Sequence, residues 1–177
     1  MTWGDDKAWS DRYLPLIKGI VGPRLLVDAP LEVDQKHATD LIVMRARDMM
    51  IAARIRRPGY ADRYPFEFTI RSARDTGAKT ELAKITEGFG DWMFYGHAAE
   101  GHAAAIARWM LVDLHAWRAH MIRRTEGRLG AIAKANGDGT YFTAFDVRRF
   151  PSEPQILVAC SHPEEMRSDD LFAEAMS

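Results

Sequence analysis

The chain has 177 residues, of which 47% are hydrophobic and 28% charged, and its formal net charge is −1. This composition excludes a disordered chain, and the length is sufficient for one domain with a substantial core. Because the net charge is close to zero, a global basic field is excluded, and any nucleic-acid surface must be a local cluster of cations. The single cysteine, Cys160, excludes an intramolecular disulfide framework.

The N-terminal sequence carries Asp5 and Asp6 where a secretory signal needs cations and a long apolar region. No run in the sequence approaches the roughly 20 apolar residues that a membrane span requires. We therefore expect a cytoplasmic protein without a membrane partner. We also expect a single domain over 1–177, with a core over 10–122, a C-terminal helix and strand pair over 123–160, and an acidic tail over 161–177.

The first half of the chain predicts an antiparallel hairpin preceded by a short helix. Apolar residues at helical spacing from Leu14 to Val21 predict the helix, which Gly22 and Pro23 end. Two runs rich in Ile, Val and Met, 39–47 and 49–57, are joined by a short polar segment and predict the hairpin at 39–57. In its second strand, alternation places Ala52, Arg54 and Arg56 on one face and Ala53, Ile55 and Arg57 on the other.

Three further elements follow the hairpin. Phe66, Phe68 and Ile70 alternate with polar residues and predict a third strand. Thr80 is the expected N-cap of a helix that opens over 80–85 and ends at 88–90, and the aromatic run 91–96 predicts a fourth strand. The order over 10–96 is therefore helix, strand, strand, strand, helix, strand, which indicates an α/β (α+β) domain with a mixed central sheet and helices packed on it.

The second half of the chain has weaker patterns. The alanine-rich segment 98–107 predicts a short helix, and 109–117 is either its continuation or, as we favour, a strand. We expect a helix over 123–135, a turn at 136–139 and a strand pair at 140–147 and 155–160. Asp113 lies within an apolar run, and such a position predicts a buried acid paired with Arg118 or another cation.

Charged residues gather around the predicted hairpin. Glu32, Asp34 and Asp40 come before or at the start of its first strand, and Arg54, Arg56 and Arg57 lie at the end of the second. Arg71 adds a cation on the third strand. Acids facing cations across a hairpin can assemble a metal or phosphate site, although ordinary cross-strand charge pairing produces the same pattern.

This order of elements resembles the restriction-endonuclease-like, or PD-(D/E)XK, nuclease superfamily. The resemblance covers about half the chain and rests on Glu32 (or Asp34) before the sheet and Asp40 at the head of a strand. It implies Mg²⁺ (or Mn²⁺) held by Glu32, Asp40 and Glu67, and it implies catalytic roles for Asp40, Glu67 and Arg54. The ion would activate water for phosphodiester hydrolysis. The DNA or RNA would be bound by Arg54, Arg56, Arg57 and Arg71.

The chain departs from this superfamily where an acid-x-Lys pair should stand. Here it has Ala52-Ala53-Arg54 or Arg54-Ile55-Arg56, and neither supplies an oxygen ligand for magnesium or a tunable lysine. Glu67, Thr69 or Asp48 would have to replace the missing ligand. Two principal functions stay open: a nuclease-like nucleic-acid-binding protein, and a non-enzymatic phage-type interaction or inhibitor protein that binds a protein partner. A site for a small phosphorylated ligand is a third alternative.

Other charged and aromatic residues have mainly structural interpretations. Glu81 and Lys84 are three residues apart and predict a surface ion pair on the helix. The histidines lack an HExxH spacing, and His97, just past the fourth strand, is the one with a functional alternative. The aromatic residues between 92 and 117 are expected in the core, because a base-stacking platform requires its rings on one exposed face.

Overall fold

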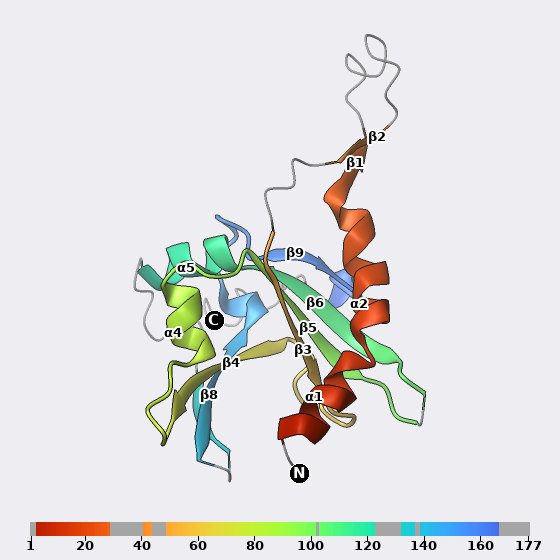
Figure 1. Ribbon diagram of the computed structural model, residues 1–177. Coiled ribbons are helices and arrows are strands. Elements are labelled where there is room, and N and C mark those ends of the chain that lie inside the picture. Colours follow the sequence, from red (N-terminus) through yellow and green to blue (C-terminus); the bar gives the residue numbers. More distant parts are fainter. Residues whose placement is uncertain are drawn as a thin grey trace, which may run out of the picture.

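The computed structural model describes residues 3–28, 41–43, 49–101, 103–122, 132–136 and 139–166. These residues form helices and β-sheets, one of them mixed, which confirms the α/β class (Figure 1). In chain order the elements are α1 (Trp3–Asp11), α2 (Leu14–Val21), η1 (Gly22–Leu25), β1 (Leu26–Asp28), β2 (Leu41–Val43), β3 (Ile51–Arg56), β4 (Glu67–Arg74), α4 (Glu81–Thr86), β5 (Trp92–Ala98), β6 (Ile106–Asp113), α5 (Leu114–Ile122), β7 (Ile132–Ala135), β8 (Thr140–Asp146), η2 (Val147–Arg149), β9 (Leu157–Cys160) and η3 (Pro163–Met166).

Two sheets carry most of the fold. A four-stranded sheet has the order β3-β5-β6-β9, in which β3 and β5 are parallel and the remaining pairs are antiparallel. A three-stranded antiparallel sheet has the order β4-β8-β7. Helices α1 and α2 run along one side of the four-stranded sheet, whereas β4, β8, α4 and α5 lie on the other side (Figure 1). None of the helices in the described part of the chain is long and apolar enough to cross a membrane.

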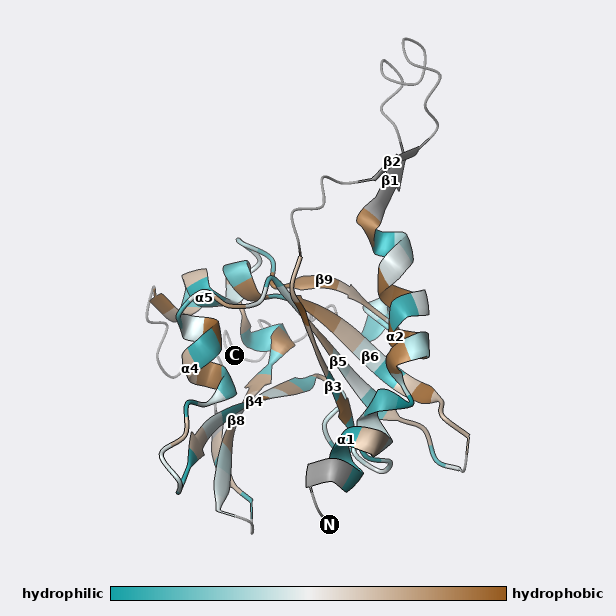
Figure 2. Ribbon diagram, in the orientation of Figure 1, coloured by the Kyte–Doolittle hydropathy of each residue, from teal (hydrophilic) through white to brown (hydrophobic). Residues whose placement is uncertain are grey.

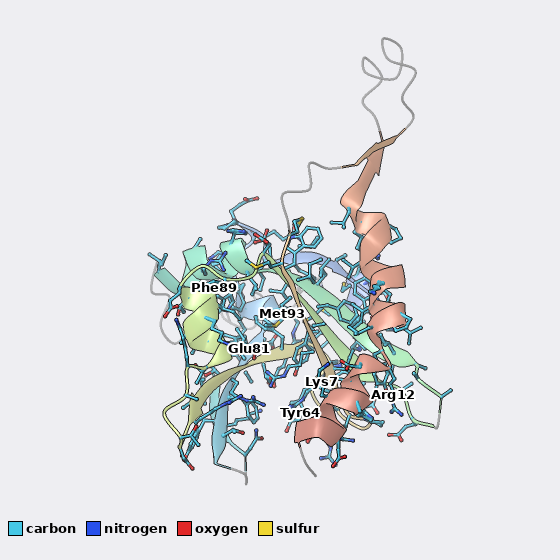
Figure 3. All side chains as sticks on the ribbon, viewed as in Figure 1. Lys7, Arg12, Tyr64, Glu81, Phe89 and Met93 are labelled. Atoms are coloured by element: carbon cyan, nitrogen blue, oxygen red, sulfur yellow. The ribbon has the colours of Figure 1, made fainter. Side chains whose placement is uncertain are left out.

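The four-stranded sheet contributes to a core on each of its faces because its side chains alternate. Phe94 and Leu111 pack with Ile17 of α2 on one face, while Met93 on the other face packs with Phe68 of β4. Figure 2 shows hydrophobic residues along β6 and β9 and on part of α2. Figure 3 shows side chains filling the space between the two sheets, with Met93 within it. The larger core therefore lies between the sheets.

The predicted hairpin at 39–57 is wrong. β2 pairs with β1, and β3 pairs in parallel with β5, in a register from Ile51↔Trp92 to Arg56↔His97. β5 is buried at every position after Trp92. Because the side chains of β5 enter both cores, the strand is buried on both faces. Its backbone N–H and C=O groups then need hydrogen-bond partners on both edges, and β3 and β6 supply them. The long-range contact therefore prevails over the local hairpin.

Several local predictions for the first half are confirmed. Helix α2 covers the predicted segment from Leu14 to Val21, and β4 and β5 stand where the third and fourth strands were expected. Thr80 is the N-cap of α4, since its hydroxyl oxygen accepts the backbone N–H of Ala83 at 3.2 Å. These elements depend on short-range patterns, which explains why the sequence was sufficient to predict them.

The predicted helix over 98–107 is wrong, because Ala98 ends β5 and Ile106 begins β6. The predicted strand over 109–117 is confirmed only as far as Asp113, after which α5 begins. Asp113 ends the strand by capping the helix. Its Oδ1 accepts the backbone N–H groups of His115 at 2.7 Å and Ala116 at 2.9 Å. Asp113 is therefore a helix cap rather than the predicted ion-pair partner of Arg118.

The C-terminal half of the described chain corrects two further predictions. The described part of the predicted helix over 123–135 is strand β7. It pairs with β8 across the predicted turn. At this turn the backbone N–H of Asn136 donates to the carbonyl oxygen of Thr140 at 2.8 Å. Strands β8 and β9 exist as expected, but they are not a pair: β8 lies between β4 and β7, and β9 pairs with β6. Partner choice again depends on tertiary contacts.

Candidate nucleic-acid interface

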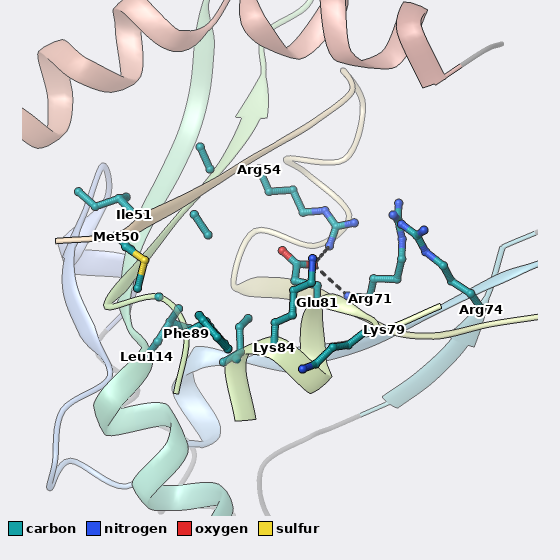
Figure 4. Close-up of a pocket in the computed structure, with 14 residues that line it drawn as sticks. Met50, Ile51, Arg54, Arg71, Arg74, Lys79, Glu81, Lys84, Phe89 and Leu114 are labelled. Carbon is teal, nitrogen blue, oxygen red and sulfur yellow. Dashed lines mark hydrogen bonds and ion pairs between the residues drawn. The ribbon is translucent and has the colours of Figure 1, made fainter. Parts of the chain in front are cut away.

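Cations from several elements line two adjoining hollows on the surface. The first, of about 510 Å³, lies between β3, β4 and α4 (Figure 4). The second, of about 600 Å³, lies between α1 and the end of β3, and it shares Arg54 and Arg71 with the first. We call the two hollows together the basic groove. Eight cations line it: Lys7, Arg54, Arg56, Arg57, Arg71, Arg74, Lys79 and Lys84. Two carboxylates accompany them, Asp6 and Glu81.

The alternation of β3 distributes its arginines as predicted. Ala52 packs in the core between the sheets, and Ile55 packs in the core beside α2. Arg54 and Arg56 share the face of Ala52 and so lie toward the three-stranded sheet. Arg57 follows the strand and turns toward α1, where its Nη2 lies 2.8 Å from Asp6 Oδ1 and its guanidinium lies 4.6 Å from the ring centre of Trp9.

Glu81 holds the centre of the groove together. Its Oε2 accepts hydrogen bonds from Nη1 of Arg54 at 3.1 Å and from the backbone N–H of Arg71 at 3.1 Å, as the dashed lines in Figure 4 show. The same Nη1 of Arg54 donates to the carbonyl oxygen of Thr69 at 2.9 Å. Glu81 therefore links α4 to β3 and β4, and its partner among the described ion pairs is Arg54 rather than the predicted Lys84.

The acids proposed as magnesium ligands are only partly within the described residues. Glu32, Asp34, Asp40 and Asp48 lie outside them. Glu67 begins β4, and its Oε2 lies 3.6 Å from Nζ of Lys134. Within the described ranges, no group of three or more His, Cys, Asp or Glu side chains could hold a metal ion. The structure therefore leaves the proposed ligand set as a prediction.

Glu67 and Arg56 come together in a third, smaller cavity of about 250 Å³ between the two sheets. We call it the aromatic cavity. Besides these two residues and Lys134, its lining includes Tyr60, Tyr64, Thr69, Tyr95, His97 and Phe142. Arg56 and Tyr60 also line the basic groove, so the two spaces adjoin. The sequence pattern had singled out Arg56, Glu67 and His97, but the aromatic residues around them carried no sequence signal that joined them.

His97 is a buried titratable group of the aromatic cavity, with a relative exposure of 1%. Burial and the positive charges of Arg56 and Arg108 lower its pKa to about 4. The imidazole is therefore neutral at neutral pH. The hydroxyl groups of Thr69 and Tyr95 lie 3.0 Å apart, so the buried residues of the cavity lining contribute neutral polar groups.

A second polar cluster lies at the start of β3 and β5. Asp91 Oδ1 lies 2.8 Å from Nε2 of His115, whose Nδ1 accepts Nη2 of Arg118 at 2.9 Å. Asp91 Oδ2 also accepts the backbone N–H of Met50 at 2.8 Å. The hydrogen bonds from His115 and Met50 lower the pKa of Asp91. This cluster was not predicted from the sequence, and its contacts join the beginnings of two neighbouring strands to α5.

Comparison of the chain with protein-family models, with curated proteins and with solved structures finds no match. Guanidinium and ammonium groups form charge-assisted hydrogen bonds with phosphate oxygens, and guanidinium groups can do so through two parallel N–H donors. The basic groove offers eight such groups from four elements or their adjoining segments.

Proposed function

We propose that this protein binds the phosphate backbone of a nucleic acid along the basic groove. The observation that carries the proposal is the concentration of eight cations around two adjoining hollows, in a chain whose net charge is −1. Among the described residues, four of these cations form ion pairs, with Asp6, Asp11, Glu81 and Glu87, so cations remain in excess. A charge distribution this uneven creates a local positive field that attracts polyanions. Two adjoining hollows also suit a chain of phosphates better than one small phosphorylated molecule, which would need only one.

The arginines at the centre of the groove are ordered before any ligand binds. Arg54 is held by Glu81 and the carbonyl oxygen of Thr69, and Arg56 stacks at 4.5 Å over the ring of Tyr60. Ordering a long side chain on binding costs conformational entropy, so prior contacts of this kind reduce that cost. The preformed positions of Arg54 and Arg56 therefore support phosphate binding.

Removing two groove cations is expected to weaken the salt dependence of oligonucleotide binding. In fluorescence-anisotropy titrations of a labelled single strand, Arg74→Ala combined with Lys84→Ala should reduce the slope of log K against log salt by roughly 1.4, at about 0.7 for each phosphate that is no longer neutralised. Both residues are exposed, so folding should be retained.

The control combines Lys18→Ala with Arg149→Ala, two exposed cations outside the groove, and should keep the wild-type slope. An equal reduction of the slope in both variants, or no salt-dependent binding by the wild type, would contradict the proposal.

Glu81→Gln is expected to shift binding in the opposite direction. Removing a carboxylate from among the cations should tighten oligonucleotide binding roughly fivefold, corresponding to about 1 kcal/mol for two charges 4 Å apart in water. The glutamine amide oxygen can still accept the hydrogen bonds from Nη1 of Arg54 and from the backbone N–H of Arg71, so Arg54 keeps its position. The variant lacks the ion pair with Arg54, but this pair is partly exposed, so thermal unfolding should show only a small destabilisation. Weaker binding by Glu81→Gln would argue against an electrostatic groove.

Metal-dependent hydrolysis of the bound strand remains a proposal from the nuclease resemblance. Two of its three ligands, Glu32 and Asp40, lie outside the described residues, and the third, Glu67, lies in the aromatic cavity beside Arg56. The test is incubation of labelled DNA and RNA with the protein and Mg²⁺ or Mn²⁺, beside an Asp40→Ala variant. Cleavage that is absent in the variant supports hydrolysis, whereas binding without cleavage supports a binding protein.

A further inference from the structure

The aromatic cavity has the size and the walls of a site for one planar ring system. Its volume of about 250 Å³ is below the roughly 300–1,000 Å³ of pockets for drug-sized ligands. The rings of Tyr60 and Tyr64 lie 6.2 Å apart at 30°, and the guanidinium of Arg56 lies 4.5 Å from the centre of Tyr60 and 5.5 Å from that of Phe142. Flat aromatic and guanidinium surfaces are those on which unpaired nucleobases stack.

One residue of the cavity lining has a buried polar atom that needs a partner. Nδ1 of His97 is buried and has no hydrogen-bond partner among the described residues. Buried polar atoms are nearly always hydrogen-bonded, and His97 is among the residues that line the cavity, so we infer that a ligand bound there supplies the missing partner. The neutral imidazole can donate or accept at this atom, and the carboxylate of Glu67 offers an acceptor in the same cavity. Base edges present both donors and acceptors.

The cavity is also placed where a base could reach it. Arg56 and Tyr60 line both the cavity and the basic groove, so a strand whose phosphates follow the groove passes its opening. A base in a duplex is paired and stacked and is not available to enter, whereas a base in a single strand is. The cavity would therefore accept a base from a single strand and not from a duplex.

We propose that the aromatic cavity binds one unpaired nucleobase of a single strand whose backbone lies in the basic groove. This inference rests on the proposed function, because the groove brings the strand to the cavity. It assigns stacking to Tyr60, Tyr64 and Arg56, and hydrogen bonding to His97 and Glu67. The ligand class is thus a single-stranded nucleic acid.

The test compares a labelled thymine strand with an abasic strand of the same length, which keeps the phosphates and lacks the bases. The wild-type protein should bind the thymine strand about tenfold more tightly, as expected for a stacked base. Tyr64→Ala should remove this difference, while Tyr64→Phe, which keeps the ring, should retain it. The Arg74→Ala and Lys84→Ala variant should weaken binding of both strands and keep the difference between them.

Equal binding of the two strands by the wild type would overturn the base site, and so would an undiminished difference in Tyr64→Ala. In either case the groove proposal would stand if both strands still bind with a salt slope that the groove variant reduces. Failure of both strands to bind would overturn the proposed function and this inference together. Quenching of a single aminopurine in the strand on binding to the wild type gives a second readout that requires no variant; unchanged fluorescence in the bound strand would count against the site.

Discussion

Replacement of Trp117 by alanine is expected to lower the free energy of unfolding by about 3–5 kcal/mol. Trp117 lies on α5, is fully buried and packs edge-on against Phe145 of β8, with ring centres 5.5 Å apart at 88°. It belongs to the core that joins the four-stranded sheet to the three-stranded sheet. Removing the indole would leave a large cavity between these layers, and a core can relax into such a cavity only partly.

Trp117→Phe is the matched control for this prediction. It keeps an aromatic ring in the core and removes the indole N–H, which is buried without a hydrogen-bond partner among the described residues. The phenylalanine variant should therefore retain well over half of the stability that the alanine variant loses. Urea unfolding of both proteins, followed by circular dichroism, measures the difference. Equal stability of the two variants would show that this ring does not hold the sheets together.

The second large effect is a loss of stability on acidification caused by His97. The pKa of His97 is about 4 in the folded protein, against about 6.5 in an unfolded chain. The unfolded state therefore binds more protons between these two values. Stability should be greatest above pH 6.5 and should fall as the pH is lowered toward 4, with a contribution from His97 of about 3 kcal/mol.

His97→Gln isolates this contribution, because glutamine does not titrate in this window. Carboxylates elsewhere also take up protons there, so the relevant quantity is the difference between the two proteins. Urea unfolding at neutral pH and near pH 4 should show a steeper loss of stability in the wild type than in the variant. Parallel losses in both proteins would mean that His97 is accessible to protons in the folded state and would argue against its buried position beside Arg56 and Arg108.

The sequence by itself determined the elements that depend on short-range physics. Period-two alternation located β4 and placed Arg54 and Arg56 on one face of β3, and Thr80 was identifiable as a helix cap because capping involves residues only three apart. The aromatic residues between 92 and 117 were also expected in the core, where Phe94, Tyr95 and Trp117 are buried. A predictable feature here is one whose partners lie within a few residues.

Only the tertiary structure decided which segments pair. The predicted hairpin is wrong because β3 pairs with an edge of β5, a strand that is buried on both faces. β5 is distant from β3 in the sequence, so the residues next to β3 do not indicate this pairing. Asp113 resembled a buried acid because the change from strand to helix occurs at that residue, and the cap becomes visible only with the helix in place. In both cases a local pattern was compatible with two structures, and long-range burial selected one.

The candidate site shows the same division between local pattern and tertiary contact. The cations of β3 and β4 were recognisable in the sequence, and the fold brings them together with Lys7 of α1 and Lys84 of α4 around one groove. The partnership of Glu81 with Arg54 and the aromatic cavity around His97 depend on residues that are 27 or more positions apart or belong to different sheets. The residue types, and the faces of a strand on which they lie, can be read from the sequence. A cavity exists only where packing leaves space, and the position of this cavity depends on how the two sheets pack against each other.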